Sequence, residues 1–592
     1  MFKLFIYRSR HLIMNKRIII LALGLTLCAG VFAQGLHKEI TVEQQIVPKK
    51  REASRIKVLP TLSLPAIQPV KLNFSDRVIT ARVPNAITTL EPIAFGDKLY
   101  TSPYKGYVAL GIFPLFNADF SAGYRLIDTD KTRLSAWGQY NGDVYTEKIE
   151  AEPTNVKLYH RDHTASIGTD LHQAIGEKSF LDAELNYTYG YHTVPVGLAS
   201  FSQASNRVNA ALNFNSRTEG LLYSIGIDYQ HFGFNDMKYP EGYSYQLKDY
   251  DYKPVKQNLI RATFKGLLPM GESSFIGLDA DANFLMTSAH NQALFPYSGE
   301  FSANGSKNSG LVSLLPHYLY QVQNATVHIG AQVDLSIKDD KAFHIAPDVT
   351  LAWTPSQTIG LELRAHGGST LNTIASLYDI TPYLNGSLAY SQSHIPYAFD
   401  GKVALGPFLG TSIEFFGGYA KANKWLMPTL TGHYAGGQLF DRVDLSGWHF
   451  GAAIGYEYRK IASARISYET APNDYDNAYY MWRDRAKHVV NAELNLRPVK
   501  PLLLTFNWEF RGGRREFGFI PSASGETGPN MYQIYSQSLG AVSTLNIGAG
   551  YEYTDNITFF VRGENLLNRK YLHLGERRSQ GITALIGASL KF

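Results

Sequence analysis

The sequence predicts an all-β protein, a transmembrane antiparallel β-barrel of about 22 strands of the outer-membrane type. Three observations lead to this prediction: a signal peptide, a repeated alternation of apolar and polar residues, and a final strand that ends on an aromatic residue. Alternation with a period of two gives a strand one apolar and one polar face. In a barrel that spans a membrane, these faces meet lipid and water.

The last twelve residues show the alternation most clearly. Every second position is apolar: Ile582, Ala584, Ile586, Ala588, Leu590 and Phe592. The positions between them are mostly small or polar. A single strand of this kind also occurs half-buried in soluble sheets, so the prediction depends on the many further copies upstream.

The same strand resembles the insertion signal of bacterial outer-membrane barrels at Gly587, Leu590 and Phe592. Leu585 departs from that signal, which usually has a polar residue at this position. The resemblance implies that the barrel-assembly machinery recognises the chain end. It also implies that this strand closes the barrel by pairing with the first strand, so that no open edge faces the lipid.

Residues 1–33 have the pattern of a secretory signal peptide that is cleaved after Ala33. Two basic residues precede the mainly apolar run 18–27, and small residues stand at the cleavage positions. The run is too short to span a bilayer, which argues against a membrane anchor. Cys28 is the only cysteine, and the leucine before it disfavours a lipoprotein signal. The mature chain would then have neither disulfides nor thiolate metal sites.

Charge and composition narrow the class of protein. The formal charge of +5 comes entirely from five basic residues within 1–33, which leaves 51 basic and 51 acidic residues. A neutral chain gives no electrostatic argument for nucleic-acid binding. Aromatic residues make up 13%, yet the mean hydropathy is only −0.17. Such values are typical of strands that alternate between lipid and water.

Residues 34–104 form a Pro-rich segment without periodic apolar residues. We expect an extended chain that lies in the periplasm or in the barrel lumen. Glu39, Ile40, Thr41, Val42 and Glu43 loosely resemble the short motif by which energised receptors contact TonB. Five residues of common types match such a motif easily by chance, so TonB is only a candidate partner.

Residues 105–592 are predicted to form one domain of successive strands. Clear alternation occurs at 117–126, 181–191, 276–286, 327–337, 448–458, 502–510 and 541–553. Many strands exceed nine residues and have aromatic residues near the ends of the apolar face, as expected at membrane interfaces. A soluble sandwich also alternates, but its strands are short. Charged residues occupy the other face, for example Asp279, Asp281, Arg465 and Glu469.

Short and long connections alternate along this domain. Turn-forming residues predict short connections at 128–131, 176–179, 271–273, 498–501 and 554–556. Long connections are expected at 142–157, 232–255, 287–307, 471–486 and 512–537. This alternation is typical of bacterial outer-membrane barrels, in which the short turns are periplasmic. An even number of strands places both ends of the barrel in the periplasm.

Residues 559–571 resemble the end of TonB-dependent receptor barrels. The core of this motif is Glu564, Asn565, Leu566, Leu567, Asn568 and Tyr571. Segments 378–385 and 415–419 resemble mid-barrel parts of the same family more weakly. The resemblance covers 105–592 and implies a receptor-like barrel in the outer membrane, whereas 34–104 is too short for the family's globular plug. The signal ending and plugless layout are similar to proteins of Bacteroidetes-type bacteria.

The sequence shows no enzyme signature. It has 17 histidines, but no His-Glu-x-x-His, no Gly-x-Ser-x-Gly and no Gly-rich phosphate loop. His160, His163 and His172 are close in sequence and could gather a metal, although solvated histidines are the simpler interpretation. We therefore predict no catalytic residue, no cofactor and no metal.

Two of the long loops are rich in aromatic residues. These residues are Tyr239, Tyr243, Tyr245, Tyr250, Tyr252, Tyr475, Tyr479, Tyr480 and Trp482. Exposed aromatic loops suit the binding of a sugar, a peptide or a hydrophobic ligand, or the docking of a surface lipoprotein. The alternative is that the rings extend the upper aromatic girdle and pack the loops together.

The sequence thus predicts an outer-membrane TonB-dependent-receptor-like barrel that takes part in the uptake or passage of a ligand. The alternative is a non-transporting barrel that serves as a subunit or scaffold of an outer-membrane complex. So wide a barrel must be narrowed by 34–104, by infolded loops or by a plug-like partner.

Overall fold

The computed structural model describes thirteen segments of the chain. They are 104–113, 117–149, 155–196, 199–218, 220–235, 256–288, 308–337, 341–383, 392–429, 439–471, 486–521, 532–572 and 578–592. The predicted signal peptide, the TonB-contact candidate and all nine loop aromatics lie outside these residues. The chain divides into the units 1–73 and 74–592, and the described residues belong to the second.

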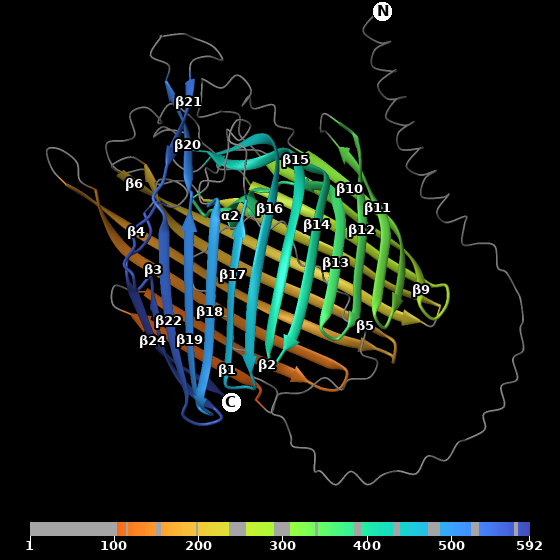
Figure 1. The fold of residues 1–592 in the computed structure, drawn as a ribbon, viewed down its shortest axis with the longest axis horizontal. Coiled ribbons are helices and arrows are strands. Elements are labelled where there is room, and N and C mark those ends of the chain that lie inside the picture. Colours follow the sequence, from red (N-terminus) through yellow and green to blue (C-terminus); the bar gives the residue numbers. More distant parts are fainter. Residues whose placement is uncertain are drawn as a thin grey trace, which may run out of the picture. The chain divides into compact units, whose positions relative to one another are not determined.

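Twenty-two strands form one closed antiparallel sheet, as the sequence predicts (Figure 1). Strands of the first half are β1 (Gly106–Phe113), β2 (Asn117–Asp128), β3 (Thr132–Ile149), β4 (Val156–Ile175), β5 (Ser179–Val196), β6 (Ala199–Thr218), β7 (Leu221–Phe234), β8 (Lys256–Pro269), β9 (Ser274–Ser288), β10 (Asn308–Val322) and β11 (Ala325–Ile337). Those of the second half are β12 (Phe343–Ser356), β13 (Ile359–Leu371), β14 (Gln392–Phe408), β15 (Thr411–Thr429), β16 (Leu439–Tyr458), β17 (Ala462–Thr470), β18 (His488–Val499), β19 (Leu502–Gly512), β22 (Val542–Glu552), β23 (Ile557–Glu564) and β24 (Thr583–Lys591).

The barrel closes where β1 pairs with β24. Each remaining strand pairs with its neighbours in the sequence, apart from β19, which pairs with β22 across a separate two-stranded sheet. That small sheet consists of β20 (Arg515–Pro521) and β21 (Tyr532–Ser538). Closure satisfies the backbone hydrogen-bonding groups of every barrel strand, which is what the hydrocarbon core of a membrane demands.

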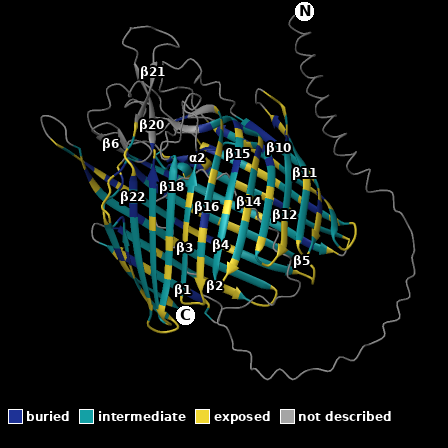
Figure 2. Cartoon of the chain, viewed as in Figure 1, coloured by how far each residue is buried: buried dark blue, intermediate teal, exposed yellow. Residues whose placement is uncertain are grey.

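The two faces of each strand differ as the alternation predicts, and exposed and covered residues follow one another along the strands in Figure 2. Large apolar side chains face outwards on β24, where Ile586 is 64% exposed. Leu585 points into the lumen and is buried. There it fills the space left by Gly111 on β1, which explains why an apolar residue is tolerated at this signal position.

The short turns occur where they were predicted, but two of the long connections are wrong. Residues 143–149 extend β3 and pair with β4, so the loop expected at 142–157 shrinks to 150–155. Alternation weakens here, and the continued hydrogen-bonded ladder is a contact between distant residues that no local pattern reports. The loop expected at 512–537 contains the β20–β21 hairpin.

Within the described segments, one helix interrupts the all-β pattern. α2 (Ile374–Ile380) lies in the connection between β13 and β14. Thr373 caps its start, since its hydroxyl accepts a hydrogen bond from the Ser376 backbone N–H at 3.0 Å. The helix ends at Ile380, because Pro382 disfavours helical backbone angles at the preceding residue, Thr381. Of the two segments with a weaker family resemblance, 378–385 begins in this helix and 415–419 lies in β15.

No helix among the residues that the structure describes is long and apolar enough to cross a membrane.

Candidate functional site

The luminal wall of the barrel is lined by charges of both signs that pair with one another. Asp281 on β9 accepts hydrogen bonds from Arg261 on β8. Arg465 on β17 pairs with Glu414 on β15 at 2.5 Å. Asp279, Asp281, Arg465 and Glu469 thus lie on the polar face that the sequence predicts. Because these charges are neutralised locally, the wall has no single-sign funnel along these strands.

A row of carboxylates and imidazoles crosses the luminal side from β13 to β17. Asp400 accepts from His366 at 2.9 Å and lies 3.1 Å from the His449 ring nitrogen Nε2. The other ring nitrogen of His449 is 3.6 Å from Glu469. Each imidazole therefore has a carboxylate partner, which fixes ring orientation in a polar environment.

The three histidines singled out in the sequence do not come together. His160 is buried against Glu147 at 3.0 Å, and His172 contacts Asp182 at 2.6 Å. His163 has the opposite orientation and contacts the Tyr140 hydroxyl at 2.9 Å. Within the described segments, no group of three or more His, Cys, Asp or Glu residues could hold a metal ion.

A small pocket of about 160 Å³ lies in the wall formed by β18, β19 and β22, beside the β23–β24 connection. Its polar lining consists mainly of amide, carboxylate and guanidinium groups: Asn491, Glu493, Asn507, Glu509, Arg511, Thr544 and Asn546. Tyr571 of the family-like motif closes one side. The pocket can accept a small polar group. No local sequence pattern indicates it, because residues from three strands and a connection form it.

The closing-strand residues lie at the barrel seam. Gly587 is opposite Gly111 on β1. Leu590 faces outwards and is 44% exposed. Phe592 exchanges backbone hydrogen bonds with Gly106, at 2.8 and 2.9 Å, and stacks on Tyr124 with ring centroids 6.0 Å apart. The terminal aromatic residue therefore joins the end of β24 to both β1 and β2.

The motif 564–571 forms the turn that leaves β23. Asn565 has a left-handed backbone, with φ of 47°. Its side-chain amide donates to the Arg569 and Gln580 carbonyls at 2.8 and 2.9 Å, and its oxygen accepts from the Arg569 N–H at 3.0 Å. Asn tolerates this backbone geometry and satisfies the turn, so the structure assigns Asn565 a conformational task.

The other motif residues support the same connection. Asn568 also has a positive φ, of 51°, and its side chain accepts from the Ile582 N–H at 3.0 Å. Tyr571 is buried beneath the guanidinium of Arg514, whose carbon lies 5.5 Å from the ring centroid. The remaining members differ in exposure: Glu564 forms an ion pair with Arg562, the backbone N–H of Leu566 donates to Leu545, and Leu567 is 43% exposed.

The sequence did not predict the contacts that α2 makes with the wall at β5–β8. Tyr378 lies 2.6 Å from His192 on β5, and Asp379 pairs with Arg207 on β6 at 2.8 Å. The Ile374 N–H donates to the Gln257 side chain on β8 at 2.7 Å. The only local hint in the sequence is the Thr373-x-x-Ser376 cap.

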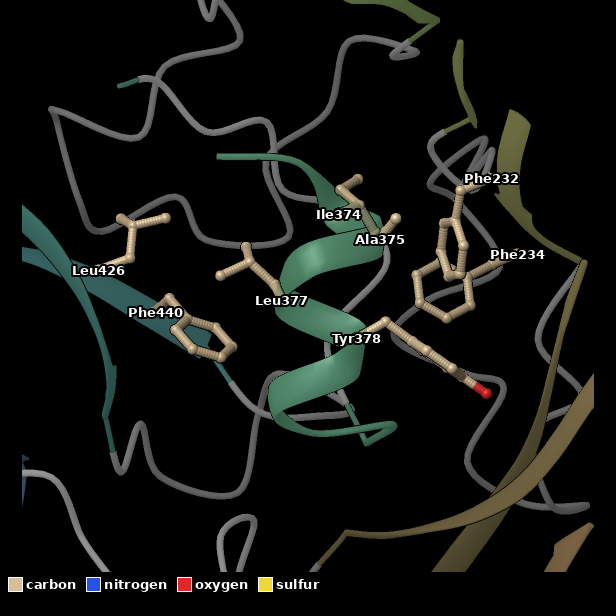
Figure 3. Close-up of a cluster of buried hydrophobic side chains, with 8 residues drawn as sticks. All are labelled: Phe232, Phe234, Ile374, Ala375, Leu377, Tyr378, Leu426 and Phe440. Atoms are coloured by element: carbon tan, nitrogen blue, oxygen red, sulfur yellow. The ribbon is translucent and has the colours of Figure 1, made fainter. Parts of the chain in front are cut away.

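An apolar cluster joins α2 to two separate parts of the wall (Figure 3). Its members are Phe232 and Phe234 of β7, Ile374, Ala375, Leu377 and Tyr378 of α2, Leu426 of β15 and Phe440 of β16. Burying a large apolar side chain contributes about 1.5–3 kcal/mol. An exposed ion pair such as that of Asp379, which is 59% exposed, contributes about 0–1 kcal/mol. Apolar burial therefore dominates the attachment of α2.

The comparison with known proteins begins with the sequence itself. No family model matches the chain, and no curated protein matches it.

Solved structures match it through the barrel. A ferric enterobactin receptor (PfeA) variant from Pseudomonas aeruginosa has a TM-score of 0.61 and 9% identity, and the match covers 82% of this chain and 80% of the receptor. The siderophore receptor PirA from Acinetobacter baumannii has a TM-score of 0.61 at 10% identity, over 83% and 81% of the two chains. This chain has the TonB-dependent receptor fold.

The FrpB iron transporter from Neisseria meningitidis also matches this chain. That structure has a TM-score of 0.57 at 10% identity, and the match covers 83% of this chain and 73% of the transporter. At identities this low, the structural match establishes the architecture alone and does not identify a ligand. The closed barrel of 22 strands agrees with the resemblance that the C-terminal motif indicated.

Proposed function

We propose that this protein is an outer-membrane barrel that takes part in the uptake of a polar ligand. The observation that supports it most is the closed 22-stranded barrel with a charged, internally paired luminal wall. Its structural neighbours are receptors for ferric enterobactin and other siderophores and a transporter of iron. By the same analogy we propose no catalytic activity, an outer-membrane location and TonB as a partner.

The proposals for the N-terminal residues and for further partners are taken from the sequence predictions. We propose that residues 1–33 are removed after Ala33 and that 34–104 occupies the barrel from the periplasmic side in place of a full plug. An extended chain of this length reaches well beyond the hydrocarbon core of about 30 Å. Its volume is smaller than a plug, so the infolded β13–β14 connection would have to fill part of the lumen. Surface lipoproteins or a plug-like protein remain candidate partners at the aromatic loops.

Growth of a host that lacks its own ferric-siderophore receptors tests the proposal. The full chain should restore growth when a ferric siderophore is the only iron source, and loss of the host's TonB should abolish it. A matched chain without 34–104 tests whether that segment is required. Failure with all siderophores, in cells that contain folded barrel, would contradict iron uptake.

A non-transporting scaffold is the second candidate, and the bridge that α2 makes across the mouth favours it. Ion conductance in a planar bilayer separates the two functions. A transporter should conduct once 34–104 is deleted, whereas a sealed scaffold should remain non-conducting with and without that segment.

A further inference from the structure

We propose that the pocket between β18, β19 and β22 binds a primary ammonium group on a short aliphatic chain. Three features of its lining support this: polar side chains that have no partner within the described segments, an excess of negative charge, and a buried, partly apolar inner end. The inference goes beyond the proposed uptake, because binding at the wall does not depend on transport.

The floor of the pocket is a regular array of polar side chains on three neighbouring strands (Figure 1). Residues directly opposite one another on paired strands point to the same face, with Cβ atoms about 5 Å apart. Two such rows cross the strands, and they consist of Asn491, Glu509 and Thr544 and of Glu493, Asn507 and Asn546. A molecule in the pocket can therefore contact side chains of both rows at once.

The guanidinium groups beside the pocket are already paired with other carboxylates. Arg465 lies directly opposite Glu493 in the sheet, yet it pairs with Glu414 at 2.5 Å. Arg511, within the lining, pairs with Glu509. Because neither guanidinium forms an ion pair with Glu493, the lining has a net negative charge.

Part of the hydrogen-bonding capacity of the lining is unused. Among the hydrogen bonds and ion pairs of the described residues, none involves the side chain of Asn491, Glu493 or Asn507. The amide of Asn546 is used in part, since its oxygen accepts from the Asn565 N–H at 2.8 Å. One carboxylate and two amides are thus available to a ligand.

An ammonium group matches what these side chains offer. It donates hydrogen bonds and accepts none, and the amide oxygens of Asn491 and Asn507 and the carboxylate of Glu493 are acceptors. Hydrogen bonds that involve an ionised group are roughly twice as strong as neutral ones. A hydroxyl has a single donor for the same acceptors, and the net charge of the lining repels an anion. The lining therefore favours a cation over a neutral or anionic molecule of the same size.

The inner end of the pocket is closed and partly apolar. Arg511, Val542 and Tyr571 are each at most 9% exposed, whereas Glu493 is exposed to the lumen. The guanidinium carbon of Arg514 lies 5.5 Å from the centroid of the Tyr571 ring and holds that ring in place. A volume of about 160 Å³ equals that of about five water molecules, which admits a short carbon chain. Since Arg511 repels a cation at the inner end, the chain points towards Val542 and Tyr571 and the ammonium group stays at Glu493.

Binding of n-butylammonium to the purified full chain tests the site. Its short chain and single ammonium group match the pocket, and n-butanol and butyrate are neutral and anionic controls of similar size. Saturation-transfer NMR in detergent micelles, with protein-free micelles as the blank, measures all three. We expect n-butylammonium to bind at least severalfold more tightly than n-butanol, and butyrate not to bind. Equal signals from the three molecules, or none from n-butylammonium, would overturn the proposal.

Variants of the lining locate the binding. Glu493→Gln keeps the size of the side chain and removes its charge, so it should weaken binding of n-butylammonium about tenfold. Asn507→Leu removes one acceptor and should weaken it severalfold. The matched control is Glu184→Gln, at an exposed carboxylate on β5 that accepts from Asn186 at 2.6 Å, and it should leave binding unchanged.

All variants should retain the unheated gel mobility of a folded barrel. If Glu493→Gln and Glu184→Gln bind n-butylammonium as tightly as the unmodified chain, the amine does not occupy this pocket and the proposal is wrong. Failure to restore growth on ferric siderophores would instead contradict the proposed uptake and leave the binding result as it stands.

Discussion

The seam of the barrel and its mouth are built by different means. At the seam, β24 and β1 pair through a regular backbone ladder from Tyr107 with Lys591 to Ile112 with Ile586. At the mouth, α2 is attached by side chains that come from strands far apart in the sequence. The seam therefore depends on a repeated strand pattern in the first and last strands, whereas the mouth depends on a few individual apolar side chains.

Because of this difference, substitutions in the two regions should alter different properties of the protein. A strand in the seam tolerates many side chains as long as the outward face is apolar and the inward face fits the neighbouring strand. The mouth depends on shape, as the buried Phe440 and the close approach of the Tyr378 hydroxyl to Gly190 show. Changes at the seam should thus alter assembly and stability, and changes at the mouth should alter permeation.

Removal of Phe592 should have the largest effect on the seam. The ring stack with Tyr124 contributes only about 0.5–1.5 kcal/mol, so its loss alone would leave most barrels folded. If the terminal residue is also recognised during assembly, the amount of folded barrel falls severalfold. The measurement is the heat-shifted gel band from outer membranes, with Phe510→Ala as the matched aromatic change. Equal amounts for the two variants would refute recognition of the chain end.

A charge on the lipid face should have the next largest effect. Ile586 is 64% exposed and lies near the middle of β24. Ile586→Lys should destabilise the barrel by about 2–4 kcal/mol, the cost of a lysine near the bilayer midplane. Leu409→Lys is the control, because Leu409 is 99% exposed in a short turn and should change little. Guanidinium unfolding in lipid vesicles measures both, and equal stabilities would contradict the membrane placement of β24.

Gly587→Ala should destabilise the seam by about 1–3 kcal/mol, which is the usual cost of overpacking. An added methyl group would overlap the Leu110 carbonyl oxygen and the Phe560 ring, and a backbone atom cannot move aside easily. Gly550→Ala is the control in β22, since nothing lies within 4 Å of its added methyl group. A similar unfolding midpoint for both variants would mean that the seam relaxes around the methyl group.

The alternation specified the barrel because it is repeated in every strand, and each repeat reports the same two environments. Residues such as Ile586 and Leu590 could therefore be assigned to the lipid face from sequence alone. The number of strands followed from counting the alternating segments, although the separate β20–β21 hairpin within 515–538 was missed. Period two does not distinguish a barrel strand from a hairpin strand above it.

The mouth could not be predicted because it depends on single side-chain contacts between remote residues, which follow no repeated pattern, whereas the seam joins equally remote strands through the alternation common to every strand. Gln257 and Ile374 are 117 positions apart, and His192 and Tyr378 are 186 apart. The helix has only seven residues and no acidic residue in its first turn, so its helical pattern is weak. The motif residues were found through resemblance, while their role in the turn after β23 required the structure.

Asn565 lies where the two regions meet, in the connection from β23 to β24, and it should give the smallest of these effects. Asn565→Gly removes three side-chain hydrogen bonds but permits the positive φ. Asn565→Ala removes the same bonds and also strains the backbone. This strain lowers the stability of the barrel by about 1 kcal/mol more. The alanine variant should therefore be less stable than the glycine variant, although glycine has the more flexible unfolded chain. Guanidinium unfolding gives the order of the two variants.

If Asn565→Gly is as stable as the unmodified barrel while Asn565→Ala is not, only the backbone geometry at 565 matters and the hydrogen bonds contribute nothing. If both variants keep full stability yet lose uptake, the motif acts on the ligand and the conformational role assigned to Asn565 is wrong.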